Sequence, residues 1–257
     1  MHINILGYGQ MAKQVAALFY LGGHTIHIWN HAPVEMGALE KQIRLLKRSM
    51  SPVSEGTISI VERLQDLEDY LTIESVVEDI EIKKSIYGSI VDKITKGYYT
   101  NTSSYSPEEI GLKVNGLHFF NPITLKLVEL CQASAATAAI DEVVVYLKSF
   151  DFEIVSVKNN RGYIGNFIIF HEISSALKLI ERYDYTVNSV NIFYKKMYEG
   201  RDIFTIIDII GIDVVLAIII NLKAHDDSLY LPASLSKAIN LNILGKKNKS
   251  SIREVLP

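Results

Sequence analysis

The sequence predicts an α/β protein with a mainly parallel sheet, followed by an all-helical domain. Three observations lead to this prediction. Short apolar runs rich in β-branched residues alternate with amphipathic helical patterns in the first half of the chain. A glycine turn follows the first of these runs, and long apolar helical patterns dominate from Gly162 onward. Strands that alternate with helices imply right-handed crossovers, and therefore a mainly parallel sheet.

The composition excludes several classes of protein. The chain has 257 residues, of which 48% are hydrophobic and 21% are charged, which is ordinary for a folded protein of one or two domains. Its formal net charge of −3 disfavours a sequence-independent nucleic-acid binder, since such a protein needs a basic surplus. The single cysteine, Cys131, excludes a disulfide framework and a multi-cysteine zinc site, and suits a reducing compartment. We assign no metal site.

Two segments bear on localisation. The first ten residues lack the charged flank and the small-residue cleavage site of a secretory signal, and instead indicate a β-strand. The most apolar stretch, Ile203 to Leu222, contains Asp208 and Asp213, which disfavours a membrane helix. We interpret this stretch as a buried helix pair at a subunit or domain interface. We therefore expect a cytoplasmic protein with no membrane partner.

The expected elements of the first half follow from its periodicity. The predicted strands span residues 2–6, 24–29, 74–77, 98–100 and 117–120. The predicted helices span residues 10–21, about 34–69 and 83–95. In the second half, helices are expected over residues 163–182, 187–198, 203–222 and 234–244.

A polar break at residues 158–162 marks the expected domain boundary. We assign residues 1–159 to the sheet domain and residues 160–257 to the helical domain, to which we ascribe dimerisation and substrate binding.

The turn after the first strand has the G-x-G-x-x-G/A pattern, with Gly7, Gly9 and Ala12 at its three small positions. Gly7 permits the tight turn, Gly9 lets the backbone approach a pyrophosphate, and Ala12 lets the helix pack closely on the strand. Such a turn can also simply link a strand to a helix. Its position as the first turn of an α/β half favours a Rossmann-like, dinucleotide-binding domain.

The end of the second strand bears on the choice of nucleotide. An acidic residue usually stands there and binds the ribose hydroxyls of NAD, but here the position is held by Asn30. An asparagine does not repel a 2′-phosphate, so NADP is not excluded. No arginine follows Asn30, so we favour NAD.

A histidine and a glutamate supply the chemical signal. His118 and Glu129 lie a few residues apart, on segments that we expect to follow strands of the dinucleotide fold. An alcohol dehydrogenase needs an imidazole that takes the hydroxyl proton while hydride leaves to a nicotinamide, and a carboxylate that fixes the tautomer.

The segments around these residues resemble the L-3-hydroxyacyl-CoA dehydrogenase family. That family carries an NTSS, a GLHFFNP and a KLVE segment in this order, which match residues 101–104, 116–122 and 126–129. The similarity extends over most of the chain and includes residues 161–166, which resemble the family's PGFIVN segment. It implies an NAD-linked oxidoreductase that interconverts 3-hydroxyacyl and 3-oxoacyl thioesters, and a homodimer joined through the helical domain.

The resemblance also implies roles for individual residues. His118 is expected to act as general base or acid, with Glu129 as its orienting partner. Ser103 and Asn166 are expected to bond the substrate oxygen or the histidine, and Asn121 to help hold the site. The residues expected to bind the cofactor are Gly7, Gly9, Gln10, Met11, Asn30, Glu78, Lys83 and Asn101. Ser103 and Asn166 could instead be helix caps.

Several departures from the family pattern stand near the substrate-facing loops. The spacing from His118 to Glu129 is one residue shorter than the family's, so the pair needs a compensating change in its loop. The segment after Glu78 lacks the Glu-Asn of the family's VEN motif, and Arg161 and Phe167 replace a proline and an arginine. These changes lead to the hypothesis of a specialised biosynthetic relative, whose thioester is carried by CoA or by an acyl carrier protein.

The competing interpretation is a non-catalytic nucleotide-binding or structural protein on the same scaffold, since fold does not fix function. Retention of His118 and Glu129 argues against it, and the altered loops argue for it. An imidazole of His118 beyond hydrogen-bond reach of Glu129 would favour the inactive protein.

Overall fold

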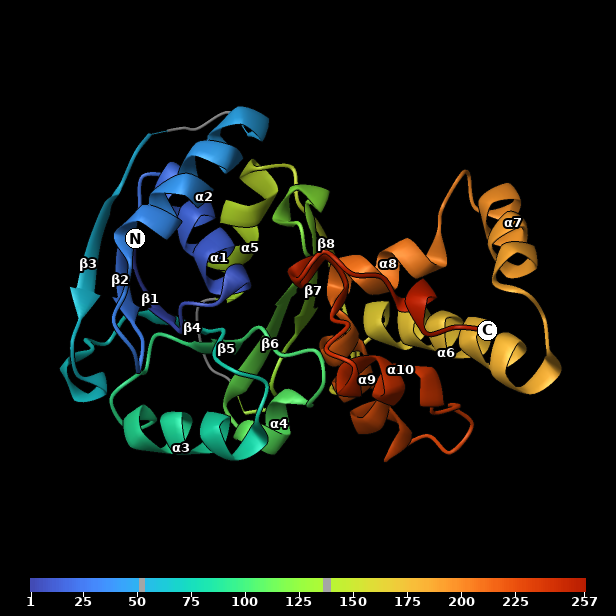
Figure 1. Ribbon diagram of the computed structural model, residues 1–257. Helices are drawn as coiled ribbons and strands as arrows, with labels where there is room; N and C mark the ends of the chain where they lie inside the picture. The colour runs from blue at the N-terminus through green and yellow to red at the C-terminus, as the bar shows by residue number, and fades with distance from the viewer. Residues whose placement is uncertain (51–53, 136–139) are drawn as a thin grey trace. The chain divides into compact units, whose positions relative to one another are not determined.

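The computed structural model describes residues 1–50, 54–135 and 140–257 (Figure 1). The chain divides into two compact units, Met1–Tyr163 and Ile164–Pro257, and each is described by itself. The first unit is built on one eight-stranded sheet, and the second consists of helices.

The sheet of the first unit has the strand order β3-β2-β1-β4-β5-β6-β7-β8. All neighbouring strands run parallel except β6 and β7, which are antiparallel. The sheet is therefore mainly parallel, as predicted. The strands are β1 (His2–Leu6), β2 (Thr25–Trp29), β3 (Thr57–Val61), β4 (Leu71–Glu74), β5 (Tyr98–Thr100), β6 (Val114–Phe119), β7 (Leu127–Cys131) and β8 (Glu153–Ser156).

Helices cover both faces of this sheet (Figure 1). The helices of the first unit are α1 (Gln10–Leu21), α2 (Met36–Ser49), α3 (Ile80–Ile90), α4 (Pro107–Ile110) and α5 (Ile140–Ser149). Two short 3₁₀ turns, η1 (Leu64–Asp66) and η2 (Ile123–Leu125), complete the unit. One apolar core joins the sheet to α1, α2 and α5, and a second joins the opposite face to α3 and α4.

Strand β1 shows why both faces are buried. Ile3 and Ile5 belong to the core under α1, whereas Leu6 belongs to the core on the α3 side. A parallel sheet covered by helices on both faces needs apolar side chains in both directions. Ala12 is 1% exposed in the first core, as expected for the small position of the glycine motif.

The predicted elements of the first half need four corrections. The long helix expected up to residue 69 ends at Ser49, and an edge strand, β3, follows it. The strand expected at residues 74–77 is β4, which ends at Glu74. The helix expected from Lys83 is α3, which begins at Ile80 because Asp79 caps it through its side chain. Strands β7 and β8 were not predicted.

The second unit contains the predicted helices, with one of them divided. Its helices are α6 (Gly165–Tyr183), α7 (Val187–Met197), α8 (Ile203–Ile210), α9 (Ile212–Lys223) and α10 (Ala233–Asn240), followed by the 3₁₀ turns η3 (Gly245–Lys247) and η4 (Ile252–Glu254). Their inward faces form a single apolar core.

The apolar stretch from 203 to 222 is a helix pair, as predicted. Gly211, at a φ of +101°, ends α8 and starts α9, and the two helices are bent by 97°. No single helix of the described residues is long and apolar enough to span a membrane, although the bent pair passes on length and composition. The buried Asp208 accepts hydrogen bonds from Ser251 Oγ and Ile252 N, which fastens the C-terminal segment to α8.

Candidate active site

A cleft of about 780 Å³ lies where β1 and β2 end and α1 begins. Gly7 and Gly9, predicted from the glycine motif, line it, and so does Asn30, predicted from the end of the second strand. At a φ of +102°, Gly7 lies so close to the next strand that a Cβ there would stand 2.5 Å from Ser75 O. Glycine is therefore required at this turn.

The N-terminus of α1 is open towards this cleft. Gly9 is the N-cap of α1 and provides no side-chain hydrogen bond to the helix. In the described part of the chain, nothing lies within 4 Å of the place where a Cβ of Gly9 would stand. Backbone N–H groups at a helix start attract anions, and the open space admits a phosphate group. The glycine turn thus fits the pyrophosphate of a dinucleotide.

Asn30 donates through Nδ2 to Ala32 O, which fixes its amide at the end of β2.

The other residues of the cleft were not among the predicted site residues. The remaining lining residues are Tyr8, Trp29, His31, Ser75, Val76, Val77, Glu81, Ile82, Ser85 and Ile86. They follow β1, β2 and β4 or lie on α3, so the correct end of β4 was the signal needed to find them.

Two of the residues expected at the cofactor, Glu78 and Lys83, are engaged elsewhere. Lys83 is 1% exposed, and its Nζ lies 2.8 Å from Glu74 Oε1 and 3.2 Å from Glu78 Oε2. Glu78 in turn accepts from Thr102 Oγ1 and, at 3.2 Å, from Ser104 N. None of these residues lines the cleft. Lys83 and Glu78 therefore connect α3 to the loop that contains Ser103.

Their opposite charges favour the ionised forms of Lys83 and Glu78. Burial opposes the ionisation of Lys83, but Glu74 and Glu78 outweigh it, so the pKa of the Lys83 ammonium is raised. Burial likewise opposes ionisation of Glu78, but Lys83 and the bond from Thr102 outweigh it, so the pKa of the Glu78 carboxyl is lowered. Thr100 Oγ1 and Val76 N also donate to Glu74, which occupies both of its oxygens.

Asn101 fastens the same loop to β6. Its Oδ1 accepts from Phe119 N at 2.9 Å, and its Nδ2 donates to Ser75 Oγ at 3.3 Å. Ser103 is half-buried in this loop. The helix cap proposed as an alternative for Ser103 is made instead by Ser106, which forms a capping box with Glu109.

His118 and Glu129 form the predicted pair. They lie within β6 and β7 rather than after strands, and they stand opposite each other in the antiparallel register. His118 Nδ1 lies 2.7 Å from Glu129 Oε2, and the residues are 7% and 2% exposed. Since an ionised carboxylate can only accept, Nδ1 holds the proton and Nε2 is left as the basic nitrogen.

The shortened loop between the two strands closes without disturbing this pair. It contains η2, and Lys126 then adopts a left-handed conformation that leads into β7. Asn121 Oδ1 accepts from Gln14 Nε2 at 3.0 Å and from Gln10 Nε2 at 3.4 Å, while Gln14 Oε1 accepts from Ile123 N. Asn121 thus binds the loop to α1, and Gln14 was missed in the sequence because it lies in a helix interior.

The surroundings of the imidazole are aromatic. The ring centroids of Phe120 and Tyr163 lie 4.7 Å and 6.0 Å from that of His118. Cys131 lies on the same strand as Glu129, and burial raises the pKa of its thiol to about 11. Cys131 is therefore an inert core residue, as the sequence indicated.

The other predicted site residues have these places. Met11 is half-buried against the first core, and its sulfur accepts from Gln14 Nε2. Asn166 is 7% exposed in the first turn of α6, in the second unit, and the N-cap of that helix is Ile164. Outside residues 51–53 and 136–139, no group of three or more potential ligands could hold a metal ion.

Comparison with known proteins agrees with this geometry. Residues 2–160 match the model of the 3-hydroxyacyl-CoA dehydrogenase NAD-binding domain. The chain belongs to the 3-hydroxyacyl-CoA dehydrogenase family. It is 29% identical to a 3-hydroxybutyryl-CoA dehydrogenase of Clostridioides difficile over 97% of both chains. It is 25% identical to human mitochondrial hydroxyacyl-coenzyme A dehydrogenase over 96% of this chain and 88% of the human protein.

Solved structures show the same fold as this 3-hydroxyacyl-CoA dehydrogenase family member. FadB2 of Mycobacterium tuberculosis matches with a TM-score of 0.86 at 24% identity, over 97% of both chains. The (S)-3-hydroxybutyryl-CoA dehydrogenase PaaH1 of Ralstonia eutropha matches with a TM-score of 0.81 at 20% identity, over 98% of this chain and 97% of that one.

Proposed function

We propose that this chain catalyses the NAD-linked interconversion of a 3-hydroxyacyl and a 3-oxoacyl thioester of coenzyme A. The observation that carries the proposal is the buried contact of 2.7 Å between His118 Nδ1 and Glu129 Oε2. The family membership supports the same reaction and supports NAD as the cofactor.

The pair performs the proton half of the reaction. Glu129 holds the Nδ1–H of His118, so Nε2 takes the proton of the substrate's 3-hydroxyl as a carbonyl forms at C3. When bound in the cleft at Gly7 and Gly9, NAD would supply the acceptor for the hydride that leaves C3. The imidazolium that results is stabilised by the carboxylate of Glu129, and in the reverse direction it returns the proton to the oxygen.

Other residues hold the reactants in this proposal. Ser103 and Asn166 bond the substrate oxygen or the imidazole, and the backbone of Gly7, Gly9, Gln10 and Met11 binds the pyrophosphate. Residues 1–159 form the dinucleotide-binding domain and residues 160–257 the substrate and dimerisation domain. Lys83 and Glu78 act on the cofactor site through the loop at Ser103, because their polar atoms pair with each other.

A thioester on an acyl carrier protein is the second candidate substrate, in a specialised biosynthetic enzyme. The substitutions Arg161 and Phe167, at positions where the family has proline and arginine, favour it. The shortened loop does not, since it preserves the contact between His118 and Glu129. The same contact argues against the non-catalytic alternative.

A fluorescence titration of the purified protein with NADH and NADPH tests the cofactor. We expect NADH to bind more tightly, because no arginine or lysine lines the cleft beside Asn30 in the described residues. Tighter binding of NADPH would contradict this choice.

Turnover of a thioester panel tests the substrate. Oxidation of NADH with acetoacetyl-CoA, and rapid reduction of NAD with 3-hydroxybutyryl-CoA, would support the CoA substrate and contradict the specialised enzyme. Turnover of acyl-carrier-protein conjugates alone would support the second candidate. Binding of NADH without turnover of any 3-oxoacyl thioester would support the non-catalytic alternative.

The proposal includes a cytoplasmic homodimer joined through the second unit. Helix α7 carries Ile192, Phe193 and Met197, each more than half exposed, and an exposed apolar surface of this kind suits an interface. Light scattering on the protein as it leaves a size-exclusion column should give the mass of a dimer. Phe193→Glu should weaken the association of the two chains. A monomer at micromolar concentration would contradict the assembly. The single cysteine supports the cytoplasmic assignment.

A further inference from the structure

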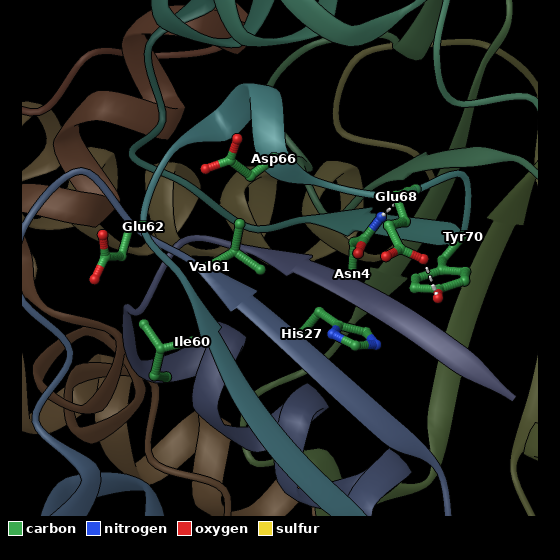
Figure 2. A pocket seen from close by; sticks show the side chains of 8 residues that line it. All are labelled: Asn4, His27, Ile60, Val61, Glu62, Asp66, Glu68 and Tyr70. Atoms are coloured by element: carbon green, nitrogen blue, oxygen red, sulfur yellow. Dashed lines mark hydrogen bonds between the residues drawn. The ribbon is translucent and has the colours of Figure 1, made fainter.

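A second pocket, of about 390 Å³, lies on the first unit away from the glycine turn (Figure 2). It shares no lining residue with the cleft, and none of the predicted site residues lines it. The residues that line it are Asn4, His27, Ile60, Val61, Glu62, Asp66, Glu68 and Tyr70.

The floor of this pocket is the face of the sheet opposite α1 and α2. Ile3, Ile5, Ile26 and Ile28 point into the core under α1, so the alternate residues Asn4 and His27 face the other way. Such a face is expected to carry apolar residues where it is covered, yet here it carries an amide and an imidazole.

The amide oxygen of Asn4 has no hydrogen-bond partner among the described residues. Asn4 is 0% exposed, and its Nδ2 donates to Glu68 O at 3.0 Å and to Thr72 Oγ1 at 3.1 Å. Because the carbonyl of Glu68 can only accept, the atom against it must be the nitrogen. The oxygen, turned towards the pocket in Figure 2, is buried and has no hydrogen bond. A buried acceptor of this kind costs stability unless a donor satisfies it.

The ionic groups of the pocket are acidic. Glu62, Asp66 and Glu68 line it, and Asp66 is paired with Arg63. Within the described residues, Glu62 and Glu68 have no lysine or arginine at ion-pair distance, although Tyr70 donates its hydroxyl to Glu68. Arg63 also acts on Glu62 through its charge, so Glu68 is the carboxylate of the pocket that no lysine or arginine of the described residues offsets at short range.

His27 adds no positive charge to balance them. Its Nδ1 lies 2.7 Å from Ser59 Oγ and its Nε2 lies 3.1 Å from His2 Nδ1, so both ring nitrogens have partners. Burial, and then the neighbouring His2, lower the pKa of the His27 imidazole. The ring stacks on Tyr70 with centroids 5.0 Å apart. Glu62, Asp66, Glu68 and the amide oxygen of Asn4 thus offer acceptors and negative charge to a ligand, beside the apolar side chains of Ile60 and Val61.

We propose that this pocket binds a small organic cation with a primary ammonium or guanidinium group. The cation's N–H groups would donate to Asn4 Oδ1 and to the carboxylate of Glu68, and its charge would be offset by Glu68 and Glu62. A volume of about 390 Å³ is within the range of small-molecule sites and holds a chain of about ten non-hydrogen atoms. The site is separate from the proposed dehydrogenase reaction and does not depend on it.

Titration of the whole protein with spermidine and with agmatine, followed by NMR and calorimetry, tests this site. We expect saturable binding that shifts the side-chain amide signals of Asn4, whereas tetramethylammonium, which has no N–H, should bind at least about tenfold more weakly. Equal affinity for tetramethylammonium, or no binding of either amine, would overturn the proposal.

Two variants that each remove one negative charge distinguish binding in the pocket from general electrostatic attraction to the protein. Glu68→Gln should weaken spermidine binding about tenfold. Glu153→Gln removes the charge of another exposed glutamate, on β8 at the other edge of the sheet, and should leave the affinity unchanged. Equal weakening by both variants would overturn the site. N-acetyl-lysine amide distinguishes a peptide side chain from a free cation, and its binding more tightly than spermidine would overturn the assignment to a free cation.

Discussion

His118 and Glu129 lie directly opposite each other on the antiparallel strands β6 and β7, and they are eleven residues apart in the chain. Residues paired across antiparallel strands have closely spaced Cβ atoms, so the register itself brings the imidazole and the carboxylate together. The backbone pairing of β6 with β7 therefore positions both residues of the pair. The loop between the two strands contains η2 and the left-handed Lys126, and it closes with this pair in contact.

Replacing Glu129 tests the role of the carboxylate. Glu129→Gln preserves size but removes the charge that stabilises the imidazolium and fixes the Nδ1–H tautomer. We expect kcat to fall by about 10²- to 10⁴-fold. NADH affinity, measured by fluorescence, should stay within a factor of about two, because Glu129 is not part of the cofactor cleft. A kcat close to that of the wild type would contradict the proton transfer through His118.

Removing Lys83 should destabilise the first unit strongly. Lys83→Met leaves the buried Glu74 without its cation, and breaking a buried pair in this way costs about 3–5 kcal/mol. Denaturant unfolding measures the loss. Lys84→Met is the matched control on the same helix, because Lys84 is paired only with the exposed Glu81 and should change the free energy of unfolding by less than about 1 kcal/mol.

The double variant Lys83→Met with Glu74→Gln checks the cause. It removes the uncompensated charge, so it should recover part of the stability lost in Lys83→Met. An equal loss in the single and the double variant would show that the ion pair is not what stabilises α3 against the sheet.

The two glycines of the turn should respond differently to alanine. A Cβ at Gly7 meets Ser75 O at 2.5 Å and requires a φ of +102°, so Gly7→Ala should cost about 2 kcal/mol or more of stability. A Cβ at Gly9 meets nothing within 4 Å in the described residues, so Gly9→Ala should fold normally. Its methyl group would occupy the space proposed for the pyrophosphate, so NADH should bind about tenfold more weakly. A folded Gly9→Ala with unchanged NADH affinity would place the pyrophosphate elsewhere.

Acid should weaken the contact between Glu109 and Arg161. Burial opposes ionisation of Glu109, but the Arg161 guanidinium and the N–H and hydroxyl of Ser106 lower the pKa of the carboxyl from 4.5 to about 2. Because the folded-state pKa is depressed, this stabilisation is present above about pH 4.5 and is lost as the pH falls towards 2. In Glu109→Gln, the fall in stability over this range should be smaller. Identical acid profiles for the variant and the wild type would contradict the contribution of this pair.

The sequence predicted what depends on local patterns. The glycine motif predicted the tight turn at Gly7 and the close packing of Ala12 correctly, since both follow from backbone geometry and packing alone. The helices of the second unit followed from their apolar periodicity. Asp208 was recognised as a reason against a membrane helix, but its partner Ser251 is 43 residues away and could not be read from spacing.

What the sequence missed depends on pairing between distant segments. β3 is a short edge strand whose sequence, TISIV, has the β-branched alternation of a strand, and it was missed because the charged helical pattern before it was extended through it. Glu74 was placed at the start of a strand that in fact ends there, and α3 was placed three residues too late, so the role of Asp79 as its cap was not predicted. That shift also concealed that Lys83 points inward to two carboxylates.

The most direct test of the central claim is NADH oxidation with acetoacetyl-CoA by the wild type and by His118→Ala. If His118 is the acid that protonates the 3-oxo group, the wild type should turn over, and the variant should lose about 10²- to 10⁴-fold in kcat while binding NADH as before. A His118→Ala variant that oxidises NADH at the wild-type rate would contradict the assignment of the reaction to the pair of His118 and Glu129.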